Sequence, residues 1–306
     1  MTTDTRILAF GEAAIAEAAR LIMSGEVVAV PTETVYGLAA DATNAEAVAR
    51  IYEAKGRPGF NPLIVHVSNL AEAQEIAALN PPLLELAEQH WPGPLTLVAP
   101  QNPGSKIASL VTAGLRTIAL RVPAHPAMRA LLQAVGRPLA APSANASGAI
   151  SATRAEHVAK SLGRRIPLII DGGRCPGGVE STIIAEENGR LRLLRPGPIA
   201  IPGAEAAASG TIEAPGQMAS HYAPSKPLRL DVTRAEANEL LIGFGAVTGD
   251  LNLSPSADLV EAAANLFDCL HQADAAPQPA IAVAPLPETG LGLAINDRLR
   301  RAAAPR

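Results

Sequence analysis

Two cationic residues stand close together in the segment EAKGRPGFNPLIVHV, residues 53–67. Lys55 and Arg57 flank a glycine, and two prolines restrain the turn that leads into an apolar, strand-like run. A planar guanidinium and a compact ammonium on such a turn can bind one anion with little ordering entropy left to lose. Exposed basic turns are common, however, so this pattern alone favours an anion site only slightly. His66, on the strand, fits either a donor to the same anion or a buried core histidine.

Polar side chains also follow two other apolar runs. PTETVYGLAADA, residues 31–42, presents Thr34 among other polar groups, and APSANASG, residues 141–148, presents Ser143 and Asn145. Open α/β sheets hold their ligands at the carboxyl ends of strands. The same residue types also form Asx and Ser turns that only shape the backbone. Each segment by itself leaves ligand binding and turn formation equally open.

Three further segments carry groups that suit an anionic ligand. DGGRCPGGVESTII, residues 171–184, has four glycines before Ser181. Glycine allows backbone N–H groups to approach an anion closely, although a mobile hairpin tip would explain the same glycines. Arg195 lies on the turn LRPG, and Tyr222 lies in HYAP, where an exposed tyrosine has little structural purpose.

Several well-known reaction types are excluded by motifs that the sequence lacks. It has no HExxH or cysteine-rich metal spacing, no GxSxG nucleophile elbow, no GxxxxGK[ST] phosphate loop and no complete dinucleotide fingerprint. Basic patches interleaved with stacking aromatic residues are missing as well. The two cysteines, Cys175 and Cys269, lie far apart and fit reduced, incidental thiols. We therefore expect no metal site built from protein ligands.

The elements that position these residues alternate along the chain. Apolar periodicity predicts helices at 12–23, 44–54, 70–78, 82–90, 126–134 and 153–161. Apolar and β-branched runs predict strands at 27–32, 62–67, 95–100, 117–123, 138–144, 167–173, 181–186 and 190–197. This alternation indicates an α/β fold, in which helices pack on a sheet.

A second, smaller unit follows a linker. Residues 203–227 are small, contain proline and glycine and lack periodicity, as linkers do. Beyond them the sequence predicts strands at 228–232, 241–246 and 280–287 and helices at 234–240, 257–272 and 295–303. We expect a main domain at 1–205, a linker at 206–227 and a C-terminal α/β domain at 228–306.

The bulk properties fit a globular protein of two domains. The chain has 306 residues, of which 48% are hydrophobic, and this is enough for a sizeable core. A formal net charge of -4 argues against a protein that coats nucleic acid with its whole surface. No apolar run reaches the roughly 18 residues that span a bilayer, and the N-terminus lacks a signal-peptide pattern. We therefore expect a cytoplasmic protein.

Taken together, the motifs resemble those of the threonylcarbamoyl-AMP synthase family, the YrdC-like proteins, in the longer form with an extra C-terminal domain. The elements that carry the resemblance are PTETVYGL, Lys55-Gly56-Arg57, NPLIVHV, Ser143-Ala144-Asn145, GGVESTII and LRPG, followed by HYAP and the terminal GLGLAINDRLRRAA. They occur in order over nearly the whole chain. The resemblance implies a YrdC-like twisted open sheet with flanking helices, plus a small Rossmann-like C-terminal domain.

The resemblance also implies an activity, that of a nucleotidyltransferase. Such an enzyme makes threonylcarbamoyl-AMP and pyrophosphate from L-threonine, bicarbonate or CO2, and ATP, for modification of the adenosine beside the tRNA anticodon. Other proteins carry out the transfer to tRNA, so contact with tRNA is at most transient and the acidic net charge raises no conflict. Mg²⁺ is implied as a cofactor held mainly through ATP phosphates.

The family pattern implies a role for each matching residue. Threonine binding is implied for Thr34, His66, Arg121, Ala141 and Ser181. Nucleotide binding is implied for Arg57, Asn61, Thr117, Ser143, Ser151, Arg195 and Tyr222. The catalytic group is implied to be Lys55, Arg57, Ser143 and Asn145. The linker around Tyr222 is implied to close as a lid, although Ala219 stands where this family often has a basic residue.

Two alternative functions are compatible with parts of this pattern. One is a carbamoyl-transfer enzyme with the same core, which would use carbamoyl phosphate and normally sits beside zinc-finger and acylphosphatase segments; this sequence supplies neither segment. The other is a non-catalytic RNA-binding translation factor with a basic concave face, whose RNA affinity would fall steeply with salt.

Overall fold

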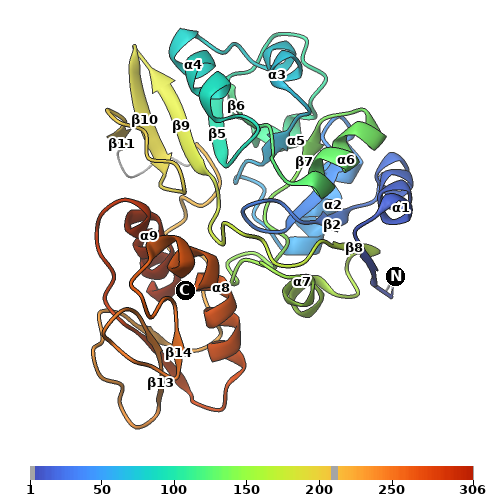
Figure 1. The fold of residues 1–306 in the computed structure, drawn as a ribbon. Helices are drawn as coiled ribbons and strands as arrows, with labels where there is room; N and C mark the ends of the chain where they lie inside the picture. Colours follow the sequence, from blue (N-terminus) through green and yellow to red (C-terminus); the bar gives the residue numbers. More distant parts are fainter. Residues whose placement is uncertain (1–3, 208–212, 306) are drawn as a thin grey trace.

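The protein folds into two units, each built around one β-sheet (Figure 1). The structure is a computed structural model that describes residues 4–207 and 213–305. In Figure 1 the C-terminal unit, drawn in orange to red, lies against the larger unit, with α8 and α9 on the side that faces it. No helix within the two described ranges combines the length and the apolar character that crossing a membrane requires.

The larger sheet is mixed parallel and antiparallel. Among the described residues it has eleven strands in the order β1-β8-β2-β3-β7-β4-β6-β5-β9-β10-β11. These strands are β1 (Arg6–Ala9), β2 (Val28–Val30), β3 (Gly37–Asp41), β4 (Ile64–His66), β5 (Leu95–Pro100), β6 (Thr117–Arg121), β7 (Leu139–Ala140), β8 (Leu168–Asp171), β9 (Thr182–Glu187), β10 (Arg190–Arg195) and β11 (Glu205–Ala206). The helices that accompany them are α1 (Glu12–Met23), α2 (Ala45–Lys55), α3 (Leu70–Ile76), α4 (Pro81–His90), α5 (Ser109–Thr112), α6 (Pro126–Val135) and α7 (Ala155–Leu162).

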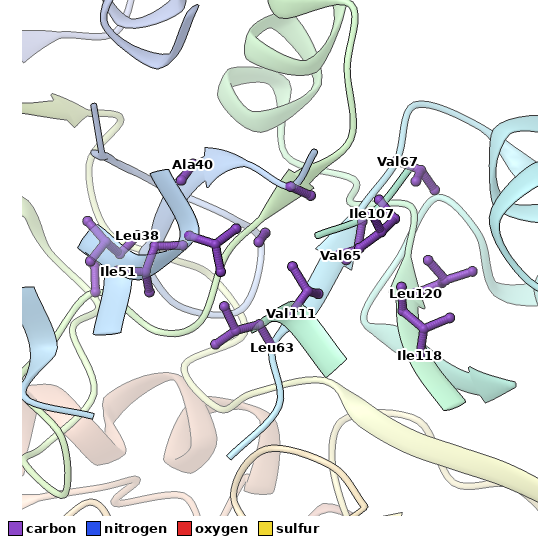
Figure 2. Packing of buried hydrophobic residues seen from close by; sticks show 14 of the residues in the cluster. Leu38, Ala40, Ile51, Leu63, Val65, Val67, Ile107, Val111, Ile118 and Leu120 are labelled. Atoms are coloured by element: carbon purple, nitrogen blue, oxygen red, sulfur yellow. The ribbon is translucent and has the colours of Figure 1, made fainter. Parts of the chain in front are cut away.

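Helices cover both faces of this sheet, as its nearly uniform apolar strands require. Along β2, Ala29 joins one hydrophobic cluster with α2 and α7, whereas Val28 and Val30 join another with α1 and α6. This alternation is the two-residue period of a strand. Figure 2 shows the first cluster, in which Ile51 of α2 lies beside Leu38 of β3. The α/β class predicted from the sequence is confirmed.

The C-terminal unit contains a parallel sheet. Its described strands are β12 (Leu228–Arg229), β13 (Glu239–Gly243), β14 (Leu251–Asn252) and β15 (Ala280–Val283), in the order β12-β15-β13-β14. Its helices are α8 (Leu259–Ala275) and α9 (Leu291–Ala303). Its hydrophobic cluster also includes Val35, Ile150 and Val179 of the larger unit. The two units therefore share part of one core.

One glycine brings the backbones of the two units into direct contact. A Cβ atom at Gly178 would lie 2.0 Å from the carbonyl oxygen of Ala263 in α8. Gly178 also has a φ of 70°, a backbone conformation that residues with a side chain rarely adopt. The glycine-rich loop and α8 can pack this closely only because residue 178 has no side chain.

The predicted helix at 234–240 is wrong. In the structure Glu239 begins β13, and the residues before it form bends and a turn. RAEANEL contains good helix formers, but Leu240 and Leu241 lie in a strand paired with β15, so burial in the sheet overrides local propensity. The last helix begins at Leu291, four residues before the predicted start at 295. The sequence also gave no prediction for β3, which lies within PTETVYGLAADA.

Candidate active site

A pocket forms where several strand ends and loops of the larger unit meet the linker. Residues from both of these parts line it: Thr32, Thr34, Val35, Tyr36, Gly37, Arg57, Ile64, His66, Arg121, Ala141, Pro142, Ser143, Glu180, Ser181, Arg195, Pro215, Gly216, His221 and Tyr222. Nine of the residues that the sequence implicated are in this set: Thr34, Arg57, His66, Arg121, Ala141, Ser143, Ser181, Arg195 and Tyr222. The others, Lys55, Asn61, Thr117, Asn145 and Ser151, are not among these lining residues.

The register of the sheet brings the polar side chains together. β4 and β6 run parallel with His66 opposite Arg121, so both residues lie at the same end of their strands. β5 and β9 are also parallel, and the backbone N–H of Thr182 donates to the Pro94 carbonyl, which places Ser181 at the start of β9. The pocket thus lies at the carboxyl ends of β4 and β6, where open α/β sheets hold ligands, and beside the amino end of β9.

Arg121 is held by three hydrogen bonds at the floor of the pocket. Its Nε donates to the Gly93 carbonyl at 3.2 Å, its Nη1 to the Thr34 hydroxyl at 3.1 Å and its Nη2 to Glu33 at 2.5 Å. A guanidinium has five N–H donors. Arg121 therefore keeps two N–H groups for a ligand, which is the number that a bidentate carboxylate contact needs.

His66 is a buried, neutral imidazole. Burial, followed by the nearby positive charge of Arg121, lowers the pKa of His66 to about 3. Its Nδ1 is buried and has no hydrogen-bond partner among the described residues. A neutral ring that lines a polar pocket with an unpaired nitrogen is suited to contact a ligand, and less suited to a purely structural role.

Two further arginines complete the positive lining. Arg195 donates from Nε and Nη2 to the Ser181 carbonyl at 3.1 and 3.0 Å, and from Nη1 to the Pro215 carbonyl at 3.3 Å. Arg57 donates to the carbonyls of Asn61 and Pro62 at 3.2 and 2.8 Å. Burial lowers the pKa of Arg57 to about 10, so it stays charged at neutral pH.

Lys55 differs from what the sequence led us to expect. It is the last residue of α2 and not part of the turn, and its side chain is only 3% exposed. Its Nζ donates to the backbone carbonyl of Ser143 at 2.6 Å and to that of Asn145. Burial, then the charges of Arg57 and Arg165, holds the pKa of Lys55 well below its usual range. Lys55 thus supports the loop that carries Ser143 and Asn145.

The remaining implicated residues do not line the pocket and lie at different places in the larger unit. Asn145 donates from Nδ2 to the carbonyls of Ala146 and Ala149, and Ser151 donates to Glu180. Asn61 is fully buried and donates to the sulfur of Met218 in the linker. Thr117 begins β6 opposite Pro100, at the other end of the strand from Arg121. The structure thus does not bring Thr117 into the pocket.

The linker covers the pocket, and Tyr222 is buried in it. The sequence suggested an exposed tyrosine, but Tyr222 is 1% exposed and packs against Phe267 of α8 at a ring distance of 5.7 Å. Its hydroxyl has no partner among the described residues. A Cβ atom at Gly216 would lie 2.7 Å from this hydroxyl and 3.0 Å from Arg195 Cδ. Gly216 therefore lets the linker lie directly on two pocket residues.

Unpaired polar atoms gather in and around this pocket. Buried atoms without a hydrogen-bond partner in the described part of the chain include Asn61 Oδ1, His66 Nδ1, Asn145 Oδ1, His221 Nδ1 and the Tyr222 hydroxyl. A buried polar group without a partner costs about 1–3 kcal/mol. Such a concentration at one place indicates a site that binds a polar ligand.

Sequence reasoning missed several residues at this site. Glu180 lines the pocket and pairs with Arg298 of α9, yet the motifs GGVESTII and GLGLAINDRLRRAA assigned neither a role. Gly216 was read only as part of a linker, and Glu33 only as part of PTETVYGL. In the sequence, the only signal for the ion pair of Glu180 and Arg298 was the position of Glu180 next to Ser181.

Comparison with known proteins places this site in a family. The family model described as "Telomere recombination" matches residues 20–197, and the model described as "Threonylcarbamoyl-AMP synthase, C-terminal domain" matches residues 191–304. The threonylcarbamoyl-AMP synthase of Bacillus subtilis (strain 168) is 41% identical, over 95% of this chain and 93% of its own. That of Pyrococcus abyssi (strain GE5 / Orsay) is 39% identical, over 94% of this chain and 93% of its own.

A solved structure agrees with these sequence matches. The fold is similar to the crystal structure of P. abyssi Sua5 complexed with L-threonine, with a TM-score of 0.90, 37% identity and 98% of each chain covered. Both units of the chain are therefore matched by one known protein, and in the same arrangement. The chain belongs to the threonylcarbamoyl-AMP synthase family, in the form that carries an additional C-terminal domain.

Proposed function

We propose that this pocket forms threonylcarbamoyl-AMP and pyrophosphate from L-threonine, bicarbonate or CO2, and ATP. The observation that carries the proposal is the convergence of Arg57, Arg121 and Arg195 on one hollow. A carboxylate, a carbamate and a triphosphate are all anions, and arginines that reach them from separate parts of the chain suit their joint binding. The names of the B. subtilis and P. abyssi relatives support the same activity.

The threonine end of the pocket is proposed at Thr34, His66, Arg121, Ala141 and Ser181. The two free N–H groups of Arg121 take the carboxylate, and the neutral His66 ring contacts the amino acid through its unpaired nitrogen. The binding of L-threonine by the P. abyssi relative supports this part of the proposal.

The nucleotide end is proposed at Arg57, Ser143, Arg195 and Tyr222. All four line the pocket, and Arg195 and Tyr222 lie against Pro215 and Gly216 of the linker. Asn61 and Ser151 adjoin this end through Met218 and Glu180, and their roles stay predictions, as does that of Thr117. Lys55 and Asn145 are proposed to act at the reacting centre by shaping the loop that carries Ser143.

The chemistry suits such a site. The threonine amine attacks the carbon of CO2 and loses a proton, which gives a carbamate. A carbamate oxygen then attacks the α-phosphorus in line, and pyrophosphate leaves. This reaction needs positioning and charge stabilisation more than a covalent nucleophile, and holding the reactants in contact can supply on the order of 7–11 kcal/mol.

Mg²⁺ is proposed to enter as part of the substrate Mg·ATP. Among the described residues no group of three His, Cys, Asp or Glu side chains could hold a metal ion. Glu33, beside the pocket, and Glu180, in its lining, are engaged in ion pairs with Arg121 and Arg298. ATP phosphates and water are therefore the fitting ligands for this ion, as Mg²⁺ prefers.

The linker is proposed to open when substrates enter. The free volume of the pocket is about 40 Å³, whereas pockets for small ligands usually measure about 300–1,000 Å³. Admission of an amino acid and ATP therefore requires a segment such as 213–222 to move. The proposed divisions 1–205, 206–227 and 228–306 place this segment in the linker, of which residues 208–212 lie outside the described residues. Closure would protect the adenylate from water.

The product is proposed to pass to separate proteins that transfer the threonylcarbamoyl group to tRNA. A mixed anhydride of a carbamate and AMP is labile in water, so an acceptor must consume it quickly. With a net charge of -4, the chain is expected to touch tRNA at most transiently.

Pyrophosphate release by the purified full-length protein tests this function. With ATP, Mg²⁺, bicarbonate and L-threonine we expect release that stops when threonine is omitted. Arg57→Ala suppresses it, because the nucleotide end loses a charge, whereas Arg50→Ala, which removes a cation that lies outside the pocket and pairs with Glu26, leaves it intact. Release that proceeds equally well without threonine would overturn the proposal.

A further inference from the structure

Glu33 lies directly behind the pocket floor. It is not among the residues that line the pocket, although Thr32 and Thr34 on either side of it are. Its side chain is 15% exposed and forms an ion pair with Arg121, which is 4% exposed. Glu33 therefore contacts the pocket lining through its ion pair with Arg121.

Both carboxylate oxygens of Glu33 are used. Oε1 accepts from Arg121 Nη2 at 2.5 Å. Oε2 accepts from the backbone N–H groups of Ala124 and His125 at 3.1 and 3.2 Å, at the start of α6. The carboxylate thus connects the guanidinium to a fixed point of the backbone. Burial alone would raise the pKa of Glu33, but the charge and hydrogen bond of Arg121 bring that pKa below its ordinary value, so the carboxylate is ionised at neutral pH.

The contacts of Arg121 leave one N–H of Nη1 and one N–H of Nη2 free. Glu33, Thr34 and Gly93 take three of its five N–H donors and thereby fix the plane of the guanidinium. A carboxylate ligand needs two parallel N–H donors in this plane. Without Glu33 the guanidinium would keep its charge but lose the partner that sets its orientation.

We propose that Glu33 is a positioning residue that orients Arg121 for bidentate binding of the threonine carboxylate. This inference rests on the proposed function, in which Arg121 binds that carboxylate. If Glu33 acted only through its charge, its removal would strengthen threonine binding, whereas a positioning role predicts that binding weakens. A negative charge behind Arg121 repels a carboxylate ligand, so removal of that charge would then tighten threonine binding.

Glu33→Gln separates the two roles, because a glutamine has one acceptor oxygen where glutamate has two. Its amide NH2 must face either Arg121 or the N–H groups of Ala124 and His125, so one set of donors loses its partner. With the full-length protein and L-threonine in isothermal titration calorimetry, we expect Glu33→Gln to raise the Kd about 10-fold. In pyrophosphate release the KM for threonine rises similarly, while the KM for ATP stays the same.

Asp41→Asn is the matched control. Asp41 is a buried carboxylate on β3 that pairs with Arg137 at 2.7 Å and accepts the Thr43 N–H at 2.8 Å, yet it does not line the pocket. The substitution removes the same kind of interaction, a carboxylate that pairs with an arginine and accepts a backbone N–H, at a site outside the pocket. We expect a comparable loss of thermal stability and an unchanged Kd for L-threonine.

Two further measurements decide between positioning and charge. Glu33→Asp keeps the charge but is one methylene shorter, so it cannot hold both Arg121 and the start of α6. Positioning predicts weaker threonine binding for Glu33→Asp, and a charge role predicts wild-type binding. L-threonine methyl ester has no carboxylate, and positioning predicts that the wild type and Glu33→Gln bind it equally.

Each outcome supports or overturns the inference. Wild-type or tighter binding of L-threonine by Glu33→Gln overturns it, as does equal weakening for threonine and its methyl ester. A wild-type protein that fails to bind L-threonine would contradict the proposed function itself, which is a separate result.

Discussion

Arg298 and Glu180 form a buried ion pair across the boundary between the two units, with Nε and Oε2 2.8 Å apart. Arg298 is 0% exposed, also donates to the Pro196 carbonyl at 3.0 Å and lies 5.3 Å from the centre of the Tyr222 ring. Burial lowers the pKa of Arg298, but Tyr222, Glu180 and Asp297 raise it by a larger amount, so the pKa lies above its ordinary value. The C-terminal unit thus contacts two pocket residues through one side chain.

Arg298→Ala is expected to destabilise the protein and suppress pyrophosphate release. It leaves the carboxylate of Glu180 buried without its charged partner, and breaking a buried ion pair in this way costs about 3–5 kcal/mol. Urea unfolding measures the loss. Arg300 lies on the same helix as Arg298 and forms an exposed pair with Glu288; Arg300→Ala serves as the control and should change little. Equal unfolding midpoints for the two variants would contradict this prediction.

Gly216→Ala is expected to impair catalysis more than stability. Its φ of 85° disfavours any side chain, at a cost of about 1–2 kcal/mol, and the new methyl group would push against the Tyr222 hydroxyl. Gly104→Ala is the control, because Gly104 has a φ of 83° and no atom near its Cβ position. We expect the two variants to lower the melting temperature by similar amounts. Only Gly216→Ala should lose pyrophosphate release. If Gly104→Ala loses as much activity, the contact with Tyr222 is not the cause.

Lys55→Met is expected to raise the KM for both threonine and ATP. The substitution leaves the carbonyls of Ser143 and Asn145 without their buried donor, at about 1–3 kcal/mol, and so displaces the loop between the two proposed ends of the pocket. Initial rates of pyrophosphate release at varied threonine and ATP give both constants. Lys106→Met, a cation outside the pocket, is the control. Unchanged KM values with a reduced kcat would instead favour direct action of Lys55 on the reacting groups.

A stacked pair of histidines predicts loss of stability at acidic pH. His157 of α7 and His271 of α8 lie 3.8 Å apart between the two units. Burial, then the charge of His271, lowers the pKa of His157 to about 3; Asp268 opposes this shift, and Arg154 and Lys160 add to it. Between pH 6.5 and about 3 the unfolded chain binds a proton here that the native protein does not, so the free energy of unfolding falls as the pH falls.

Urea unfolding at pH 7.5, 6.5 and 5.5 measures this dependence. We expect His157→Phe to make the decline below pH 6.5 less steep without abolishing it, because the buried His66 has a similarly low pKa. His90→Gln, at the end of α4, should keep the wild-type slope. If the free energy of unfolding of His157→Phe depends on pH as in the wild type, His157 is protonated to the same extent in the native and the unfolded states.

The fold could be predicted from the sequence wherever local patterns and tertiary packing agree. Helix α1 was predicted with its observed bounds, since its buried alanines and isoleucines repeat with helical periodicity. The helix predicted at 234–240 was wrong because local pattern and tertiary packing disagree there. Its residues favour a helix locally, whereas pairing with β15 places Leu240 and Leu241 in β13, between β15 and β14.

The site could be predicted only where residue type alone indicates chemistry. Arg57 and Arg195 stood out as cations on turns, Arg121 was implied by the family resemblance, and the pocket unites all three. The sequence could not show that Lys55 points at carbonyls, because that depends on how the loop after β7 folds back on α2. Nor could it show that Arg298, more than 100 residues from Glu180, lies beside the pocket.

The contact between Gly178 and Ala263 limits how such an enzyme can change in evolution or by engineering. The backbone of α8 at Ala263 occupies the space that a side chain at position 178 would need. The glycine-rich loop can therefore pack against α8 only where the helix backbone and this glycine meet. A foreign C-terminal domain grafted onto residue 227 would meet the loop with a different surface. We expect chimeras of two homologues to work only when loop and helix are inherited from the same parent.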